Sequence, residues 1–400
     1  MRSKDSRVVT RLLLLILLIV YGRAGCASVL AGGGSSPQCL LSHSELLSSH
    51  VEPFNVSASQ ADSRLPGLAI SGDTVHVVWE EGGKIYHRFL RQGAWSAVRS
   101  VATGEQPAIA VDNAGVAHVV FVNEFGGNYE IYHCRWNGSA WSLPRNVSNT
   151  SGVSSSPGLA IAPSGMLHVV WADNTPGYNV IYHAYWDGRY WINEPVPNAT
   201  GGAPAVAVGA DGIVHVAWQD RDAPGAPYEV YHSRWNMVSW SLPENLSDSA
   251  AEQSIIPSLA TDAKGETHVV WQEKVNGRYA IYHTQSVFSS WSVPVRISGE
   301  EVEGYLPCIA ATSSGTVYAG WDESTRAQYR QKRADNASWS AVTLVMSDPV
   351  GVADLQLAVD GKGRLHAVWT QRVDAENWDV FYARLSFELA LPIVLKNVRQ

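Results

Sequence analysis

A four-residue phrase recurs along this chain and constrains its fold more than any other feature. Each copy reads His-Val-Val-Trp or a close variant, and successive copies lie about 48 residues apart. The seven copies occupy 76–79, 118–121, 168–171, 215–218, 268–271, 318–321 and 366–369. A regular repeat of that length predicts one structural unit per copy, stacked as a solenoid or arranged as a ring of blades.

Each unit contains the signals of four short strands. An apolar segment that follows a proline, such as 66–70, precedes the phrase, and a turn such as Asp112-Asn113-Ala114-Gly115 separates the two. Ile-Tyr-His or a variant comes next, followed in several copies by Trp-Ser-Leu-Pro or Trp-Ser-Val-Pro. Because the phrase is apolar at both alternating positions, its strand should be buried on both faces. These features predict an all-β, seven-bladed β-propeller of four-stranded blades, with the phrase's last aromatic residue buried between blades.

The last unit lacks its fourth strand, and the N-terminal part of the chain supplies a candidate for it. Residues 380–387 are not followed by a Trp-Ser-Leu-Pro phrase. Residues 53–57 repeat the Pro-x-Asn-Val-Ser spacing of 144–148, and the next proline follows at the same interval in both places. We therefore expect 53–57 to pair into the last blade and close the ring, which a solenoid would not require.

The N-terminal segment carries an export signal. Basic residues precede an apolar run at 12–21 that is too short to span a bilayer. Arg23-Ala24-Gly25-Cys26 resembles the end of a bacterial lipobox, so Cys26 is a lipidation candidate, and both a lipoprotein on the outer face of the membrane and a freely secreted protein fit. We expect a signal peptide at 1–27, a flexible leader at 28–49, the propeller at 50–388 and a C-terminal tail at 389–400.

Composition limits the partners of the chain. The formal net charge of -8 and the absence of a basic stripe argue against nucleic acid. The four cysteines have neither disulfide-framework nor zinc-site spacing. We expect a monomer that needs no cofactor and meets a membrane only through a lipid anchor, if it has one.

Histidine is abundant, and the repeat explains most of it. One group opens the second strand of its unit, and another ends the third strand. In the first unit, a turn at Glu81-Gly82 would place His76 directly opposite His87. In the fifth unit, Asn276-Gly277 suggests a different register. Because these residues are distributed around a ring, we expect no metal site. The two groups are His76, His118, His168, His215, His268 and His366, and His87, His133, His183, His232 and His283.

The second residue after each core aromatic is always polar. These residues begin the loops between second and third strands, which open on one mouth of the ring, where they could bind sugar hydroxyls, a cation or a basic peptide. They could equally be solvated loop residues of an acidic protein. The ligand-binding candidates are Glu81, Asn123, Asp173, Asp220, Glu273, Glu323 and Gln371, with Phe125, Tyr178, Tyr228 and Trp378 as candidate platforms for sugar stacking.

Two short motifs resemble those of sialidase-like propellers. The turns that begin at Asn137 and Asp187 are similar to shortened Asp-box hairpins, and Arg64-Leu65-Pro66 is similar to the Arg-Ile-Pro motif of sialidases. The resemblance implies a catalytic role for Arg64 alone, since no other residue matches that family's catalytic set. A hydrolase would require Arg64 and Glu81 to converge with Asp220 and Arg221 in one central cleft.

These observations favour an exported binding module for carbohydrate or another cell-surface ligand. The alternatives are a sialidase-like glycoside hydrolase and a structural or protein-interaction propeller. The sixth unit is the least regular, with Arg330 and Gln331 in place of Tyr-His. It is either a decayed copy or a specialised site built from Glu323, Arg326 and Arg330.

Overall fold

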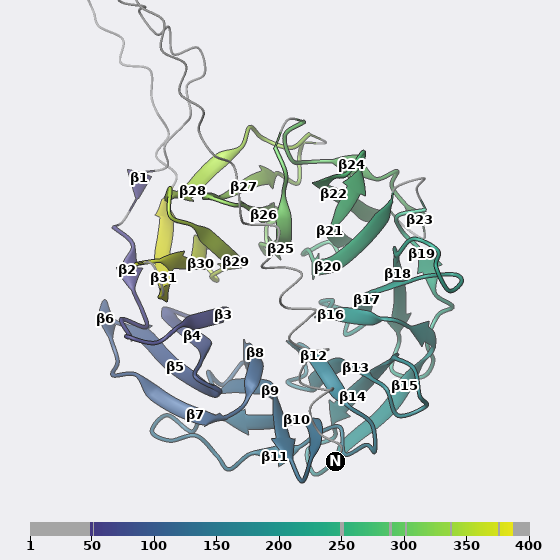
Figure 1. The fold of residues 1–400 in the computed structure, drawn as a ribbon, viewed down its shortest axis with the longest axis horizontal. Helices are drawn as coiled ribbons and strands as arrows, with labels where there is room; N and C mark the ends of the chain where they lie inside the picture. Colours follow the sequence, from purple (N-terminus) through teal and green to yellow (C-terminus); the bar gives the residue numbers. More distant parts are fainter. Residues whose placement is uncertain are drawn as a thin grey trace, which may run out of the picture. The chain divides into compact units, whose positions relative to one another are not determined.

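Seven antiparallel sheets form a ring in the computed structural model (Figure 1). The structure describes residues 49–50, 52–248, 252–287, 290–300, 302–336, 338–374 and 377–386. The predicted all-β, seven-bladed propeller is confirmed. Among the described residues, no helix is long and apolar enough to cross a membrane. The expected signal peptide, the lipidation candidate Cys26 and the C-terminal tail lie outside the described residues.

The first three blades follow one another along the chain, each running from an inner strand to an outer one. Blade 1 contains β3 (Ser63–Ser71), β4 (Thr74–Glu81), β5 (Lys84–Arg91), β6 (Ala94–Trp95) and β7 (Arg99–Thr103). Blade 2 contains β8 (Glu105–Val111), β9 (Ala117–Phe125), β10 (Asn128–Arg135) and β11 (Arg145–Asn146). Blade 3 contains β12 (Ser154–Ile161), β13 (Leu167–Asp173), β14 (Val180–Trp186) and β15 (Trp191–Thr200).

The next four blades complete the ring. Blade 4 contains β16 (Gly202–Val208), β17 (Val214–Asp220), β18 (Glu229–Trp235) and β19 (Glu244–Asn245). Blade 5 contains β20 (Gln253–Thr261), β21 (Thr267–Val275), β22 (Arg278–Val287), β23 (Ser290–Trp291) and β24 (Val295–Arg296). Blade 6 contains β25 (Tyr305–Ala311), β26 (Val317–Glu323), β27 (Arg326–Lys332) and β28 (Thr343–Ser347). Blade 7 contains β29 (Val352–Val359), β30 (Leu365–Arg372) and β31 (Trp378–Ser386), joined by β1 (Ser49–His50) and β2 (Phe54–Asn55).

The ring has two distinct faces. We call the side with the turns between second and third strands, such as Gly82-Gly83 and Gly126-Gly127, the hairpin face. We call the side with the turns between first and second strands, such as 112–115 and 262–265, the turn face. In the 112–115 turn, the Asp112 carboxylate accepts hydrogen bonds from the N–H groups of Ala114 (2.9 Å) and Val116 (2.8 Å), which fixes the reversal of the chain.

The turns that resemble Asp boxes work in the same way. Asp187 Oδ1 accepts hydrogen bonds from the N–H groups of Arg189 (2.7 Å) and Tyr190 (2.6 Å), and Asn137 Oδ1 accepts the equivalent pair in blade 2. Asn236 makes the same turn in blade 4, which the sequence comparison missed. The acidic or amide residue of this motif therefore has a turn-forming role here.

The N-terminal strand closes the last blade, as predicted. Phe54 pairs with Tyr382 and Asn55 with Phe381, and the Val56 N–H donates to the Val380 carbonyl at 2.7 Å. Val56 is fully buried. The outermost strand of blade 7 therefore comes from the opposite end of the chain from its other three.

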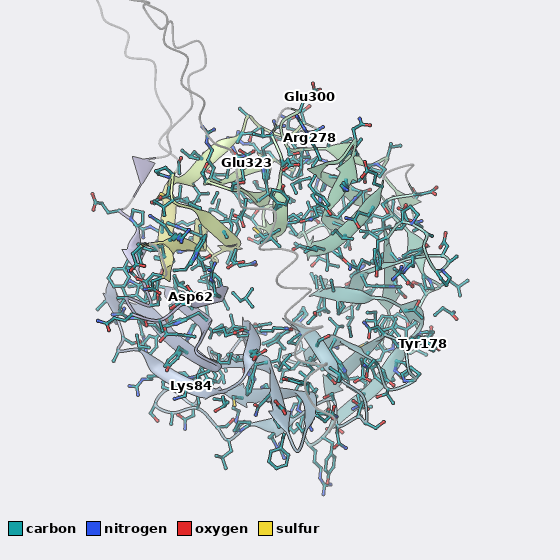
Figure 2. The ribbon with its side chains drawn as sticks, viewed as in Figure 1. Asp62, Lys84, Tyr178, Arg278, Glu300 and Glu323 are labelled. Atoms are coloured by element: carbon teal, nitrogen blue, oxygen red, sulfur yellow. The ribbon has the colours of Figure 1, made fainter. Side chains whose placement is uncertain are left out.

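The core lies between neighbouring blades, whose side chains fill the gaps from both sides (Figure 2). Trp218 of blade 4, for example, packs in one cluster with Val170 and Ile181 of blade 3. The aromatic residue that ends each phrase is fully buried in every blade, which confirms the sequence prediction. These residues are Trp79, Phe121, Trp171, Trp218, Trp271, Trp321 and Trp369.

Hydrogen bonds from side chain to backbone fasten one blade to the next. In four blades the residue directly after the core aromatic points into the next blade and accepts the N–H of a bulged residue on that blade's innermost strand. Glu80 accepts from Gln106 (3.0 Å), Gln219 from Ile256 (3.0 Å), Gln272 from Leu306 (3.1 Å) and Asp322 from Leu355 (3.3 Å). Val122 occupies this position in blade 2, and Gln106 Oε1 accepts the Ser156 N–H instead (2.9 Å).

The bulge that presents this N–H occurs in all seven inner strands. One residue of each bulge has a left-handed backbone, although none is glycine, which is an unfavourable conformation for residues with a Cβ. The residues are Leu65, Gln106, Ser156, Ala203, Ile256, Leu306 and Asp354. The inter-blade hydrogen bond compensates for part of this strain, because it satisfies the N–H that the bulge takes out of the blade's own ladder.

Replacing Val56 with aspartate should open the ring, because the new carboxylate would be buried among apolar side chains between blades 1 and 7. We expect a loss of several kcal/mol in the free energy of unfolding. Gln60→Asp, at an exposed position four residues on, is the matched control and should unfold like the wild type. Equal urea midpoints for all three proteins would contradict the closure model.

Replacing Gln272 with alanine should destabilise the contact between blades 5 and 6. The variant leaves the Leu306 N–H without its acceptor, which costs about 1–3 kcal/mol when the group stays buried. Lys274→Ala, on the same strand, removes a half-exposed ion pair with Glu252 (2.9 Å) and should cost at most about 1 kcal/mol. Chemical unfolding followed by tryptophan fluorescence compares the two, and an equal or smaller cost for Gln272→Ala would show that the fastening is unimportant.

Candidate functional site

The polar residues predicted to ring one mouth do lie at the hairpin face, and most of them bond to the core aromatic two residues earlier. Glu81 Oε2 accepts hydrogen bonds from Trp79 Nε1 (3.3 Å) and Ser63 Oγ (2.9 Å). The same indole-to-polar contact recurs four times, in Trp171–Asp173 (3.4 Å), Trp271–Glu273 (2.9 Å), Trp321–Glu323 (3.5 Å) and Trp369–Gln371 (3.4 Å).

This contact explains why the position is polar in these repeats. An indole N–H buried in the core needs an acceptor, and the side chain two residues further along the same strand face supplies it. This cause does not account for the two remaining blades. In blade 2, Phe121 has no indole N–H, and Asn123 is half-buried opposite Glu130. In blade 4, Asp220 accepts a hydrogen bond from Thr200 Oγ1 (2.5 Å), and Trp218 Nε1 has no partner among the described residues. The role of these residues in ligand binding stays a prediction.

The four residues suggested for a sialidase-like cleft come from two blades that are not neighbours. Arg64 and Glu81 belong to blade 1, while Asp220 and Arg221 belong to blade 4 at another part of the ring (Figure 1). Each arginine stacks on an aromatic residue at the hairpin face. The Arg64 guanidinium lies 4.0 Å from the Trp378 ring centroid, and that of Arg221 lies 4.6 Å from the Tyr228 centroid.

Three acidic residues with raised pKa values mark the inner edge of blades 1, 6 and 7. Burial and the neighbouring Asp354 raise the pKa of Asp322 well above its ordinary range. Burial also raises the pKa of Asp354, against the attraction of Arg64, and that of Glu80. Sequence reasoning missed this group because Asp322 and Glu80 adjoin the polar position that it singled out, and Asp354 lies in an apolar strand.

The three residues predicted to form a specialised site in the sixth blade, Glu323, Arg326 and Arg330, do not lie together. Glu323 and Arg326 face each other at the end of the hairpin, whereas Arg330 lies opposite Ala319. The two arginines are four positions apart along β27, which corresponds to roughly 13 Å. Glu323 is buried and accepts hydrogen bonds from Trp321 and Gln328.

The repeated histidines form buried pairs inside the blades, with a register that differs from the prediction. In blade 1 the turn is Gly82-Gly83, so that Val78, and not His76, lies opposite His87. The pairing is diagonal: His76 Nδ1 lies 3.1 Å from His87 Nε2. The same contact links His118–His133 (3.0 Å), His168–His183 (3.0 Å), His215–His232 (3.1 Å) and His268–His283 (3.2 Å).

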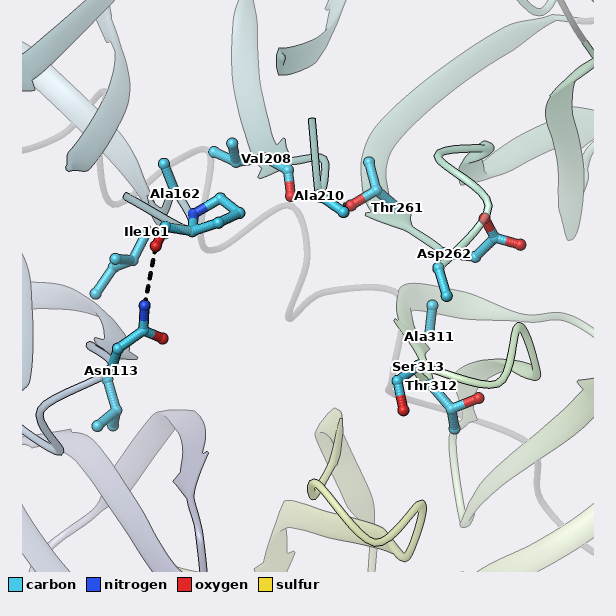
Figure 3. A pocket seen from close by; sticks show the side chains of 13 residues that line it. Asn113, Ile161, Ala162, Val208, Ala210, Thr261, Asp262, Ala311, Thr312 and Ser313 are labelled. Carbon is cyan, nitrogen blue, oxygen red and sulfur yellow. Dashed lines mark hydrogen bonds between the residues drawn. The ribbon is translucent and has the colours of Figure 1, made fainter. Parts of the chain in front are cut away.

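The centre of the ring is hollow on the turn face, where a cavity of about 480 Å³ opens (Figure 3). Short side chains from the turns of blades 2 to 6 line it, among them Ala162, Ala210 and Ala311. The Asn113 amide bonds to the Pro163 carbonyl across one side (3.0 Å). Asp262 is the one charged residue in this lining, and no aromatic residue lies in it to pack against a ligand.

A second cavity, of about 420 Å³, lies between blades 2 and 3 and has a different lining. It brings together two arginines, two histidines and a tryptophan, beside the exposed Leu143 and Ser142. The Arg145 guanidinium lies 5.2 Å from the Trp186 ring centroid. The charged and aromatic lining consists of Arg135, Arg145, His118, His133 and Trp186. We call it the Arg135–Arg145 pocket.

Strand register explains how these side chains meet. Arg135 lies opposite His118 on β9, and Arg145 lies opposite His133 on β10, so that all four reach the same region of blade 2. Burial, His118 and both arginines lower the pKa of His133 to about 3, so its imidazole is neutral at physiological pH. Neither arginine forms an ion pair with a carboxylate in the part of the chain that the structure describes.

The pocket therefore presents positive charge in a protein that is acidic as a whole. It contains guanidinium donors, a hydroxyl and an aromatic ring, which is a set suited to a polar ligand with a negative group. Sequence reasoning missed it because Arg135 and Arg145 are ten residues apart and lie outside the loops that it examined. The only signal was that the equivalent positions of the other units vary.

The buried histidine pairs should make the fold sensitive to acid. Burial lowers the pKa to about 4 for His76, His168 and His215 and to about 3 for His87 and His183. Unfolding restores a pKa of about 6.5, so below that pH the unfolded chain binds protons that the folded chain does not. The free energy of unfolding should fall from about pH 6.5 towards about pH 4, by roughly 1.4 kcal/mol per pH unit for each histidine that stays neutral.

Urea unfolding at a series of pH values in this window measures the effect. A free energy of unfolding that does not change between about pH 7 and about pH 5 would contradict the buried, neutral state of these pairs.

Comparison with known proteins identifies the architecture and no family. No protein-family model matches the sequence, and no curated protein matches it. Among solved structures, an ulvan lyase described as a new family of polysaccharide lyase matches with a TM-score of 0.60 and 12% identity, over 81% of this chain and 94% of that chain. A protein of unknown function from Dyadobacter fermentans matches with a TM-score of 0.54 and 12% identity, over 85% and 99%. A Hadza microbial sialidase matches with a TM-score of 0.49 and 15% identity, over 70% of this chain and 68% of that chain.

At these identities the likeness shows the fold alone. The chain shares a propeller architecture with carbohydrate-active enzymes, and membership of the Asp-box family stays a prediction.

Proposed function

We propose that this chain is an exported carbohydrate-binding β-propeller, and that the Arg135–Arg145 pocket takes a sugar unit that carries a carboxylate or sulfate group. The observation that carries the proposal is the lining of that pocket. Two arginines without carboxylate partners among the described residues lie beside the Trp186 ring and Ser142. Its volume of about 420 Å³ is in the range of small-ligand sites.

Each group in the pocket has a chemical task. A guanidinium binds a carboxylate or sulfate through parallel, charge-assisted hydrogen bonds. An indole ring packs against the apolar face of a sugar, and the hydroxyl of Ser142 can bond to a sugar hydroxyl. The neutral His133 supplies a donor or acceptor without adding charge.

Two further observations support a carbohydrate ligand. Phe125 (77% exposed) and Tyr178 (60% exposed) extend from the hairpin face, where an extended polymer could stack. One structure of the ulvan lyase, which matches this chain with a TM-score of 0.60 and 12% identity, is of the enzyme bound to -[GlcA(1-4)Rha3S]-. Export rests on the basic and apolar N-terminal segment at 2–21.

A glycan array that includes neutral, uronic-acid-containing and sulfated members tests the proposal. We expect binding only to acidic glycans, and we expect Arg145→Ala to weaken it at least about tenfold, as the loss of one charge-assisted contact does. Arg189→Ala is the matched control, because Arg189 is exposed in blade 3 and stacks on its own neighbour Tyr190 (5.0 Å). Added salt should weaken binding to the wild type.

Two outcomes would refute this assignment: no binding to any acidic glycan, or binding that Arg145→Ala and Arg189→Ala leave equally strong.

A sialidase-like hydrolase is the second candidate, and the acidic group at the inner edge favours it. Burial raises the pKa of Asp322 and Asp354 and so favours their protonated form, as a general acid requires, while the nearby Arg64 acts to lower the pKa of Asp354. Release of a fluorogenic aglycone from a sialoside by the purified protein would support this activity. No release above that of an Asp354→Asn variant would exclude it.

A further inference from the structure

The turn between β20 and β21 in blade 5 differs from its counterparts in one respect that concerns charge. Asp262, Glu266 and His268 each direct one ligand-type atom to a common point, and these three atoms lie within 4.8 Å of one another. Asp262 and His268 are buried, at 5% and 3% exposure, and Glu266 is half-buried. The sequence prediction of no metal site did not consider this turn.

His268 leaves a ring nitrogen without a partner at this point. Its Nδ1 bonds to His283 Nε2 (3.2 Å), while its Nε2 is buried and makes no hydrogen bond. The nearest carboxylate oxygen, Oδ2 of Asp262, is 3.8 Å away. Asp262 Oδ1 is occupied by the N–H groups of Lys264 (2.8 Å) and Glu266 (3.0 Å), so Oδ2 is the oxygen that remains for another partner.

The same turn in two other blades shows which residues stand at the position of Glu266. In blade 7 the residue equivalent to Glu266 is Arg364, whose Nε donates to Asp360 Oδ2 at 2.5 Å, and His366 Nε2 lies 3.3 Å from the same oxygen. In blade 2 the equivalent residue is Val116, and the Asp112–His118 distance is 3.4 Å. Blade 7 thus has an internal cation where blade 5 has a second carboxylate.

Nearby lysines do not take the place of that cation. Lys264 directs its ammonium group to the Ala334 carbonyl (3.3 Å), and Lys332 directs its own to the Gln285 amide oxygen. Lys332 attracts Glu266 only at longer range. Two carboxylates therefore face an imidazole nitrogen, and within the described part of the chain no lysine or arginine side chain bonds between them.

We propose that Asp262, Glu266 and His268 bind a divalent transition-metal cation, with Zn²⁺ as the ion best matched to this ligand set. Zinc takes one imidazole nitrogen and two carboxylate oxygens readily, at about 2.0–2.2 Å, which holds ligand atoms roughly 3–4 Å apart. The 3.8 Å separation of His268 Nε2 and Asp262 Oδ2 is in that range. A hard ion such as Ca²⁺ prefers an all-oxygen site, so the histidine selects against it.

The location indicates a structural role. Asp262 lines the central cavity through its backbone turn, but its carboxylate points away from the cavity and into the ring (Figure 3). The turn of blade 6 lies alongside, since a Cβ on Gly315 would be 3.6 Å from Asp262 Oδ2. A bound ion would therefore stabilise the β20–β21 turn of blade 5 beside blade 6, on the face opposite the Gln272–Leu306 bond.

Calorimetric titration of the untagged, chelator-treated full chain with Zn²⁺ tests this site, together with thermal unfolding with and without the ion. Two variants copy the other blades, so the fold already accommodates them: Glu266→Arg copies blade 7, and Glu266→Val copies blade 2. Glu124→Val, which removes one exposed carboxylate at the hairpin face of blade 2, is the charge-matched control.

We expect the wild type and Glu124→Val to bind one Zn²⁺ at this site with equal affinity and to melt at a higher temperature in its presence. Both Glu266 variants should bind this ion at least about tenfold more weakly and lose the rise in melting temperature, because one of three ligands is gone. Co²⁺ substitution should give the absorption bands of a low-coordinate site in the wild type and in Glu124→Val, and in neither Glu266 variant. Absence of Zn²⁺ binding by the wild type, or unchanged binding in both Glu266 variants, would overturn the proposal.

Discussion

The structure depends on the pairing of β2 with β31, because the blades are apolar on both faces. A blade with one neighbour would expose half of its buried residues to water, so a propeller is stable only as a closed ring. Residues 54–55 complete a sheet whose other strands come from 352–386, and Val56 extends the contact by donating to Val380. The N–H and C=O groups of β31 thereby find partners, and the chain cannot unroll from blade 7 without losing them.

A second set of contacts fixes how the blades sit against one another. Hydrophobic packing is not directional, so the cores around residues such as Trp218 and Trp271 do not by themselves determine the position of one blade relative to the next. The hydrogen bonds that the Ile256 N–H donates to Gln219 and the Leu306 N–H donates to Gln272 do so, because a bulge holds each backbone N–H in one direction. At the interface of blades 3 and 4, the residue directly after the core aromatic is Ala172, which has no side-chain acceptor for such a hydrogen bond. The chain at this interface contains Gly201 and Gly202.

The buried aromatic residue of each repeat also explains why the conspicuous polar residues are poor evidence for a ligand. Glu81, Asp173 and Glu273 are polar because a buried indole needs an acceptor. Charged side chains that the repeat does not use occur where one blade departs from the repeat sequence. Arg145 beside Trp186 and Glu266 beside His268 are both departures of this kind, and both leave charge that the described part of the chain does not neutralise.

The sequence by itself determined the number of blades, the strands within them, the buried aromatic residues and the closure of the ring. All of these follow from a pattern repeated seven times, in which local spacing and burial on both faces admit one architecture. The register that the sequence predicted for His76 and His87 was wrong, because the turn lies at Gly82-Gly83 and places Val78 opposite His87. Only the tertiary structure revealed the Arg135–Arg145 pocket and the acidic group of Asp322 and Asp354. The residues of such sites come from different strands or different blades, and their distances depend on register and on blade packing, which no local pattern encodes.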